Sequence, residues 1–196
     1  MSEGGLRVGG DRRGGLRALL TKAAAGDALE ASYRARMLAL VDSEGDCFSR
    51  DRFDPGHFTA SAFVCSPEGG ELLLILHGKL GLWLQPGGHV DPDDEDVFAA
   101  ARREVAEEVG IRALDWFGAG PEIFDLDIHT IPARPGREPA HEHFDVRVLF
   151  RARTRAFEAG SDAKDARWVS LEDIRLGQSD ESVMRAVRKL QAKLGA

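Results

Sequence analysis

Hydrophobic side chains recur every three or four residues in four stretches of the chain, which is the spacing of an amphipathic helix. The four stretches are residues 16–25, 27–41, 97–109 and 179–194. Gly26 and Gly110 follow two of them, in the position where a glycine often ends a helix. Asp27 and Glu30 have the spacing of a capping box at the start of another. The pattern therefore predicts four helices, two of them near the N-terminus.

Strand patterns occupy the chain between the second and the fourth of these helices. Residues 72–76 are apolar without interruption, which predicts a central strand buried on both faces. Residues 124–129 alternate apolar and polar side chains, which predicts a strand with one polar face. Further strands are expected at residues 57–64, 111–117 and 142–152. This order of strands and helices predicts an α/β fold in which a mixed sheet lies between helices.

The chain before the main domain falls into two predicted segments. Residues 1–15 carry six glycines among polar and charged residues, a composition typical of a flexible tail. Residues 16–45 are expected to form an N-terminal helical extension, followed by the main domain at residues 46–196. The second helix carries an apolar stripe that we expect to pack on the flank of the domain. The alternatives are a contact in a homodimer and an element that selects the substrate.

Composition narrows the class of protein. The chain has 196 residues, 43% hydrophobic and 30% charged, which suits one globular domain with a substantial core and an appendage. A net charge of -7 without an evident basic face argues against nucleic acid as the main partner, but it allows a small anion bridged by metal. Residues 1–13 lack the apolar stretch of a signal peptide, and no run approaches the ~20 residues of a membrane span. We therefore expect a cytoplasmic protein with no membrane partner. Its two cysteines, Cys47 and Cys65, have no CxxC spacing and are expected to be reduced, with a disulfide as the alternative.

The strongest chemical signal lies in the helix predicted at residues 97–109. Glu104 and Glu108 are four residues apart and Glu107 lies beside them, so three carboxylates share one edge of the helix. Carboxylates about 4 Å apart repel by roughly 4 kcal/mol at an effective dielectric near 20. Arg103 can neutralise one neighbour, whereas a hard divalent cation such as Mg²⁺ accepts several oxygen ligands. A solvated acidic face is the alternative interpretation.

A glycine loop precedes this helix, and together they resemble the signature of the Nudix hydrolases. The second half of that signature is reproduced at every position by Arg103-Glu104-Val105-Ala106-Glu107-Glu108-Val109-Gly110-Ile111. Glu95 stands at the expected separation from Arg103, but six residues instead of five separate it from Gly88. Either the loop carries one extra residue, or Asp94 takes the place of the glutamate and the helix starts later.

The resemblance implies a fold, a reaction and a set of site residues. The fold is the α/β/α sandwich of the Nudix family, and the reaction is metal-dependent hydrolysis of a diphosphate linkage in a nucleoside diphosphate joined to another group. The cofactor is Mg²⁺, with Mn²⁺ as a substitute. The implied catalytic residues are Glu107, Glu104 and Arg103, of which Arg103 orients a carboxylate. The implied metal ligands are Glu104, Glu107, Glu108, the carbonyl of Gly88 and Asp162, which precedes Trp168 in a segment similar to the closing strand of the family.

Several residues are candidates for contact with a small nucleotide or diphosphate substrate. His89, in the loop, is a candidate substrate ligand or general base, and Trp83 stacks on a base or belongs to the core. Arg147 binds substrate anions or is a solvated strand charge. His143 shares a strand face with His141 and Asp145, where the three residues line a polar cleft or form a metal site.

Two other functions are compatible with the same fold. One is a regulator that binds a nucleotide metabolite without cleaving it, although such proteins usually lack one of the glutamates that are intact here. The other is isomerisation of a diphosphate, but the isomerases of this fold place a catalytic cysteine near the loop where this chain has Gln85-Pro86-Gly87-Gly88.

Overall fold

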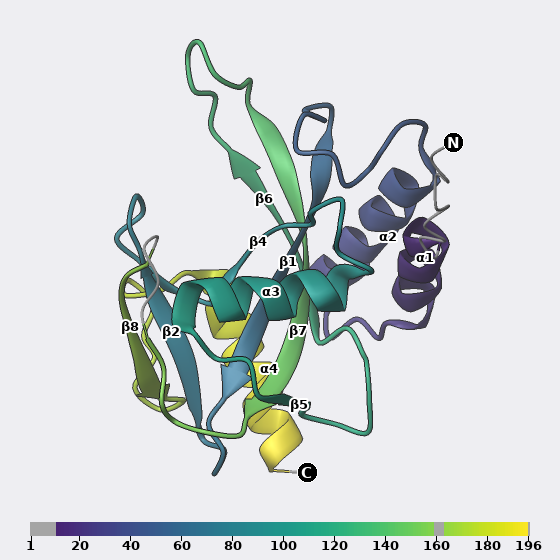
Figure 1. Ribbon diagram of the computed structural model, residues 1–196. Coiled ribbons are helices and arrows are strands. Elements are labelled where there is room, and N and C mark those ends of the chain that lie inside the picture. Colours follow the sequence, from purple (N-terminus) through teal and green to yellow (C-terminus); the bar gives the residue numbers. More distant parts are fainter. Residues whose placement is uncertain (1–10, 159–162, 196) are drawn as a thin grey trace, which may run out of the picture.

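The computed structural model describes residues 11–158 and 163–195 (Figure 1). The helices are α1 (Arg12–Lys22), α2 (Ala28–Asp42), α3 (Val97–Val109) and α4 (Glu181–Leu194). The strands are β1 (Gly56–Cys65), β2 (Glu71–His77), β3 (Trp83–Leu84), β4 (Gly87–His89), β5 (Leu114–Trp116), β6 (Asp125–Ile131), β7 (His141–Ala152) and β8 (Ala163–Ser170). The four predicted helices are therefore confirmed, and so is the strand character of each segment predicted to be extended.

The strands form one mixed sheet with the order β3-β2-β1-β7-β5. β1 and β7 run parallel from the pair Gly56–Glu142 to the pair Cys65–Arg151. All other pairings are antiparallel, with β4 on β1, β6 on β7 and β8 on β2. The uninterrupted apolar run lies in β2, which pairs with β1, β3 and β8.

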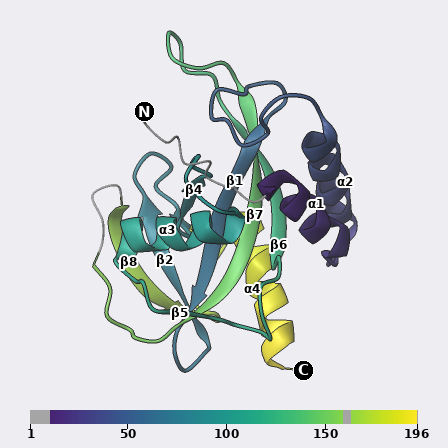
Figure 2. The ribbon, with the colours of Figure 1, turned by 45° about the vertical axis from the view of Figure 1, so that its right-hand side comes forward.

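Helices cover both faces of this sheet, which confirms the predicted α/β/α sandwich with a mixed sheet (Figures 1 and 2). α3 crosses one face, α4 lies on the other, and α1 with α2 packs beside the sheet on the α3 side. Two separate apolar clusters correspond to these layers. The α3-side cluster includes Leu16 and Leu20 of α1 and Met37 and Leu40 of α2. The predicted packing of the N-terminal helices on the domain flank is thus confirmed.

β1 shows how the sequence divides between the two faces. Phe58 and Ala60 belong to the α3-side cluster, whereas Phe63 and Cys65 belong to the cluster under α4. In the first half of β1, the buried side chains on the α4 side are polar: His57, Thr59 and Ser61. β1 is therefore apolar on the α3 side, and on the α4 side it changes from polar to apolar along its length.

The N-terminal helix begins earlier than the sequence pattern predicts. α1 starts at Arg12, and Asp11 caps it by accepting a hydrogen bond from the Gly14 amide at 2.8 Å. The assignment of residues 12–15 to a flexible tail is therefore wrong, because long-range contacts hold this turn. Arg12 donates to the carbonyl of Asp91 at 2.8 Å and stacks over the ring of Phe48. Hydrophobic spacing does not record such contacts.

Glu30 takes a role beyond the predicted capping box. Asp27 caps α2 as expected, accepting from the Glu30 amide at 2.7 Å. The Glu30 carboxylate, however, is 1% exposed and accepts from Lys189 of α4 at 2.6 Å and from the Leu126 amide of β6 at 3.2 Å. This side chain therefore joins α2 to the sheet and to α4.

The polar face of β6 is buried over most of its length. Asp125 is 0% exposed and Asp127 is 5% exposed, whereas His129, farther along the same face, is exposed, so the predicted polar face is confirmed but only its far end reaches water. Arginine and lysine side chains from β7 and α4 cover these carboxylates and pair with them. The strand therefore keeps its period of two, but both of its faces are buried from Asp125 to Ile128.

Candidate functional site

The glycine loop lies directly against the edge of α3. β4 pairs antiparallel with β1, which places Gly87 opposite Ser61 and Gly88 opposite Ala60. A Cβ atom at Gly88 would lie 2.5 Å from Oε1 of Glu104, which is closer than non-bonded atoms approach. Glycine at this position therefore brings bare backbone into contact with a carboxylate of the helix.

The three glutamates of α3 differ in their surroundings. The Glu104 side chain is only 13% exposed, and burial raises the pKa of its carboxyl group, although the hydrogen bond from Arg103 opposes this shift. The Glu107 side chain is 59% exposed. Glu108 accepts a hydrogen bond from the Gly87 amide at 2.9 Å. Glu104 and Glu108 therefore both meet the glycine loop, and Glu107 lies at its open side.

Arg103 connects these groups. Its Nη1 donates to Glu104 at 2.8 Å and to Glu107 at 3.1 Å. Its Nε and Nη2 donate to the two carboxylate oxygens of Asp94 at 3.1 and 2.9 Å, and Nη2 also donates to the His89 carbonyl at 2.8 Å. These carboxylates hold the pKa of Arg103 far above its ordinary value. A single guanidinium therefore fixes the loop to the helix.

The same contacts bear on the irregular spacing of the motif. Asp94 pairs with Arg103 through both of its oxygens. Glu95 is exposed and precedes Asp96, the N-cap of α3, whose carboxylate accepts from the Ala99 amide. The geometry therefore favours the alternative in which Asp94 takes the glutamate's place and the helix starts later.

The donor atoms at the acidic edge of α3 decide whether it fits a divalent cation. Among the described residues the three glutamates do not converge on one point, because Glu104 and Glu107 turn to Arg103 and Glu108 turns to the Gly87 amide. Their chemistry does fit. Carboxylate oxygens and a backbone carbonyl are the ligands that Mg²⁺ and Mn²⁺ prefer, and the raised pKa of Glu104 marks a carboxylate that lacks sufficient positive charge. Asp162, the fifth predicted ligand, lies outside the described residues.

Buried polar groups continue from the loop along the sheet face that α4 covers. Asp145 accepts from the hydroxyl groups of Thr59 at 3.1 Å and Ser61 at 2.7 Å. Gln85, just before the loop, donates to the Ser61 hydroxyl at 3.3 Å. The side-chain amide oxygen of Gln85, Oε1, is buried and, in the described part of the chain, has no hydrogen-bond partner.

Arg147 lies inside this network and is 2% exposed. Its guanidinium contacts the carboxylates of Asp125 at 3.4 Å, Asp127 at 3.1 Å and Asp145 at 2.9 Å. The interpretation of Arg147 as a solvated strand charge is therefore wrong. Its contact with a substrate anion stays a prediction, and its donors are engaged by these carboxylates and by Ser182.

Sequence reasoning missed the two cations that complete this network. Arg185 contacts Asp125 at 2.8 Å and Asp127 at 3.1 Å, and Lys189 contacts Asp125 at 3.1 Å. Both lie on α4, four residues apart. Their spacing places them on one face of the helix, but nothing in the sequence pairs that face with β6.

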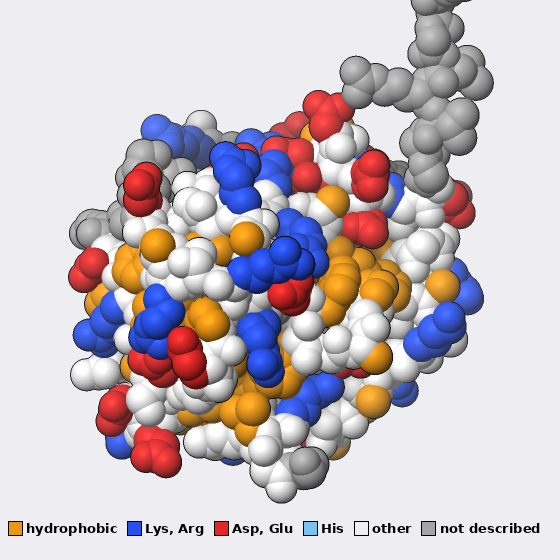
Figure 3. All heavy atoms as spheres, turned by 60° about the horizontal axis from the view of Figure 1, so that its bottom comes forward, with side chains coloured by type: hydrophobic (Ala, Val, Ile, Leu, Met, Phe, Trp, Pro, Cys, Tyr) orange, Lys and Arg blue, Asp and Glu red, His pale blue; other side chains and the backbone are white. Residues whose placement is uncertain are grey.

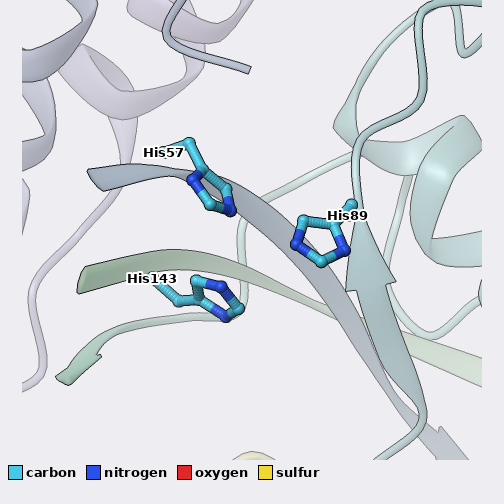
Figure 4. A group of neighbouring side chains, drawn as sticks. All are labelled: His57, His89 and His143. Carbon is cyan, nitrogen blue, oxygen red and sulfur yellow. The ribbon is translucent and has the colours of Figure 1, made fainter. Parts of the chain in front are cut away.

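The predicted residues His89 and His143 lie close together. Their ring centroids are 5.3 Å apart, and His57 of β1 lies 5.1 Å from the first and 4.8 Å from the second (Figure 4). Sequence reasoning missed His57, although it alternates with Thr59 and Ser61 in a strand that is otherwise apolar. Its place among polar side chains on one face was the available signal.

Trp83 lies on β3 and is half-buried. The guanidinium of Arg167 stacks 3.9 Å from the centroid of its ring, and the indole packs against the apolar cluster under α4. The carbonyl of Trp83 accepts from the Ser179 hydroxyl at 2.6 Å. Trp83 is thus a packed side chain in this structure, and its stacking on a base stays a prediction.

The surface in Figure 3 carries acidic and basic side chains interspersed with apolar ones, without an extended basic area on that face. Helices within the described residues are also too short or too polar to cross a membrane.

A family model described as NUDIX domain matches residues 55–188 of the chain. A search of curated protein sequences finds no match.

Solved structures with the same fold extend this result. A hydrolase of the NUDIX family from Clostridium perfringens is 25% identical with a TM-score of 0.51, and the match covers 70% of this chain and 97% of that chain. A MutT protein from Methanosarcina mazei Go1 is 18% identical with a TM-score of 0.50, covering 71% and 95%. The dihydroneopterin triphosphate pyrophosphohydrolase of E. coli is 15% identical with a TM-score of 0.51, covering 71% and 96%. At these identities the last two show similarity of fold alone.

Proposed function

The chain belongs to the Nudix family of hydrolases, and from this premise we propose that it cleaves a diphosphate linkage in a nucleoside diphosphate joined to a second group. The cleavage depends on Mg²⁺, with Mn²⁺ as a substitute. Glu104, Glu107, Glu108 and the Gly88 carbonyl are the proposed metal ligands. The substrate is a small molecule, which agrees with the net charge of -7 only if a cation bridges protein and phosphate.

One observation carries this proposal: the carboxylate edge of α3 lies in contact with a stretch of backbone that has no side chain. A Cβ at Gly88 would lie 2.5 Å from Oε1 of Glu104, so the glycine allows this carboxylate to rest directly on the loop backbone. Arg103 holds both the loop carbonyl of His89 and the carboxylate of Glu104. Loop and helix are therefore held in place before a ligand arrives, as catalysis by positioning requires.

Diphosphate cleavage needs charge neutralisation on the phosphate oxygens and an aligned, activated water. A divalent cation, when bound, supplies the neutralisation and makes water more acidic. The residues of the chain orient the carboxylates that would hold this cation. Arg103 orients Glu104 and Glu107, and the Gly87 amide orients Glu108.

Two groups are candidates for the proton acceptor. The first is the glutamate set, in which burial raises the pKa of Glu104 and so makes it a better base than an exposed carboxylate. The second is His89, whose pKa burial lowers to about 4, so that its imidazole is neutral at pH 7. Because Glu104 is also a proposed metal ligand, His89→Gln is the variant that decides: retained turnover assigns the role to the carboxylates, and lost turnover with unchanged affinity for Mg²⁺ assigns it to the imidazole.

The test is metal-dependent turnover by purified protein. A panel of nucleotide sugars, dinucleoside polyphosphates, ADP-ribose, coenzyme A and oxidised nucleotides is scored for the product formed as well as for rate. The variant with Glu107→Gln and Glu108→Gln is expected to lose several orders of magnitude in turnover, because the amides keep the shape but remove the charge that binds the cation.

The matched control is Glu95→Gln, an exposed acid of the same stretch outside the helix, which should keep full turnover. Circular dichroism establishes that each variant is folded. Turnover retained by the double variant would reject the assignment, as would tight binding of a nucleotide without any product.

A further inference from the structure

Five of the six histidines in the chain gather at one place, and three of them face a common point. His57 comes from β1, His89 from the end of β4 and His143 from β7 (Figure 4). One ring nitrogen from each lies within 4.8 Å of the others. We propose that these three imidazoles form a second metal site, for a transition metal ion of the zinc class, distinct from the carboxylate edge of α3.

The geometry requires only a small contraction. A tetrahedral ion at about 2.0–2.1 Å from each nitrogen places the ligand atoms about 3.4 Å apart, so the widest pair moves closer by up to about 1.4 Å. Rotation of the half-buried rings of His89 and His143 provides this movement. His57 is held in the strand and is 0% exposed, so it is the fixed member of the group.

A hydrogen bond to the backbone fixes the tautomer and the orientation of the His57 ring. Its Nδ1 lies 2.9 Å from the carbonyl oxygen of Arg52. Because a carbonyl only accepts, Nδ1 carries the proton and Nε2 carries the lone pair. This Nε2 is buried and, within the described residues, has no hydrogen-bond partner. A carbonyl that fixes one nitrogen of a histidine while the other is directed to an ion is the common arrangement around metal-ligating histidines.

A buried acceptor without a partner is costly, and native proteins rarely retain one without a reason. A bound ion would satisfy Nε2 of His57. Another histidine of the cluster repeats the arrangement: Nδ1 of His141 lies 2.9 Å from the carbonyl of Pro139, and its ring centroid lies 5.2 Å from that of His57. The backbone therefore sets the orientation of two neighbouring imidazoles.

The charge state of the cluster is also suitable. Burial, followed for His143 by the other imidazoles, lowers the pKa of each of the three ligands. The direction of these shifts is the one that metal binding favours, because only neutral imidazole binds metal ions.

The ligand type separates the two proposed sites. Three imidazole nitrogens favour Zn²⁺, Cu²⁺, Ni²⁺ or Co²⁺, whereas carboxylate oxygens favour Mg²⁺ and Mn²⁺. A site with three protein ligands also leaves a fourth position for water or substrate. His89 follows Gly88 directly and its carbonyl accepts from Arg103, so an ion on the imidazole would hold the glycine loop from the other side.

The experiment is a titration of untagged, chelator-treated protein with Co²⁺ in an excess of Mg²⁺, followed by visible absorption and by competition with Zn²⁺. The expected result is one equivalent bound with the strong absorption of cobalt in a nitrogen-ligated, tetrahedral site. His89→Gln and His143→Gln should each weaken binding by about 100-fold or more, since even the outer partners of a metal ligand account for about 10–100-fold.

Two controls keep this result specific. His77→Gln removes the sixth histidine, which lies on β2, and Glu107→Gln alters the carboxylate edge; both should bind Co²⁺ as the unaltered protein does. Absence of a stoichiometric site overturns the proposal, and so does affinity that survives both His89→Gln and His143→Gln. His57→Gln should also abolish binding, and if that buried substitution prevents folding, the two half-buried positions decide.

Discussion

Two groups of carboxylates in this protein have opposite electrostatic surroundings. Three aspartates under α4 are buried with three cationic side chains, of which Lys189 also pairs with Glu30: Asp125, Asp127 and Asp145 with Arg147, Arg185 and Lys189. At the acidic edge of α3 and its loop, Asp94, Glu104 and Glu107 share the guanidinium of Arg103.

The pKa values follow this difference. Arginines hold the pKa of Asp127 well below its usual range, although burial alone would raise it. Burial raises the pKa of Glu104 because a single shared arginine does not compensate it. A cluster of acids is therefore no evidence of a metal site by itself. What distinguishes the two groups is the balance at a buried carboxylate: arginines outweigh burial at Asp127, whereas burial outweighs Arg103 at Glu104.

The largest expected effect concerns stability. Asp127→Asn should lower the free energy of unfolding by about 3–5 kcal/mol, because it leaves Arg147 and Arg185 buried with one charge uncompensated. Urea unfolding in metal-free buffer measures the loss. Glu104→Gln is the matched exchange on the other group and should cost less than about 1 kcal/mol. Equal losses in the two variants would remove the distinction between the groups.

The same pair predicts a pH dependence with a definite sign. Since the folded-state pKa of Asp127 is depressed, its contribution to stability is present above the pKa of about 3.9 that an aspartate has in the unfolded chain and disappears as pH falls through the folded-state value. The stability gap between the unaltered protein and Asp127→Asn should therefore be full at pH 7 and shrink below pH 4. A gap that is constant from pH 7 to pH 3 would contradict the pairing.

The next largest effect is the stabilisation by a bound metal ion, which should depend on the carboxylates of α3 and not on those under α4. Mg²⁺ or Mn²⁺ at a hundred times its dissociation constant should stabilise the protein by about 2.7 kcal/mol, a rise in melting temperature of about 5–10 °C. The variant with Glu107→Gln and Glu108→Gln should lose this rise, whereas Asp127→Asn should keep it despite its lower starting temperature. Differential scanning calorimetry with and without the ion gives both quantities.

The smallest effect concerns the two adjacent acids of the loop. Asp94→Asn should lower metal affinity or turnover by about 10–100-fold, because Asp94 orients Arg103, which in turn orients the glutamates. Glu95→Gln should change stability by no more than about 0.5 kcal/mol, as expected of a surface position, and leave turnover unaltered. The reverse ranking would assign the motif position to Glu95 and show that the loop carries an inserted residue.

Much of the fold is predictable because hydrophobic period is a local property. The stripe of α3, the αL cap at Gly110 and the uninterrupted run of β2 all depend on residues close together in sequence. The acidic edge is predictable for the same reason, since its three glutamates lie within five residues of one helix. The motif also identifies Gly88, whose contact with Glu104 crosses from loop to helix.

What the sequence does not predict depends on which distant faces meet. Asp125 and Asp127 look solvated because their partners, Arg185 and Lys189, lie about sixty residues later in the chain. His57 looks like part of an apolar strand until the parallel pairing with β7 brings it beside His143. The early start of α1 likewise rests on contacts with residues more than thirty positions away.

The long parallel pairing of β1 and β7 also has a consequence for folding while the protein is being synthesised. Thr59 and Asp145, which are joined across it, are 86 residues apart, and such distant contacts form late in folding. During synthesis β1 emerges well before β7, so its N–H and C=O groups on that side are without a partner until residue 152 has left the ribosome. A nascent chain that stalls before that point presents an unpaired strand edge, the kind of surface on which chains aggregate.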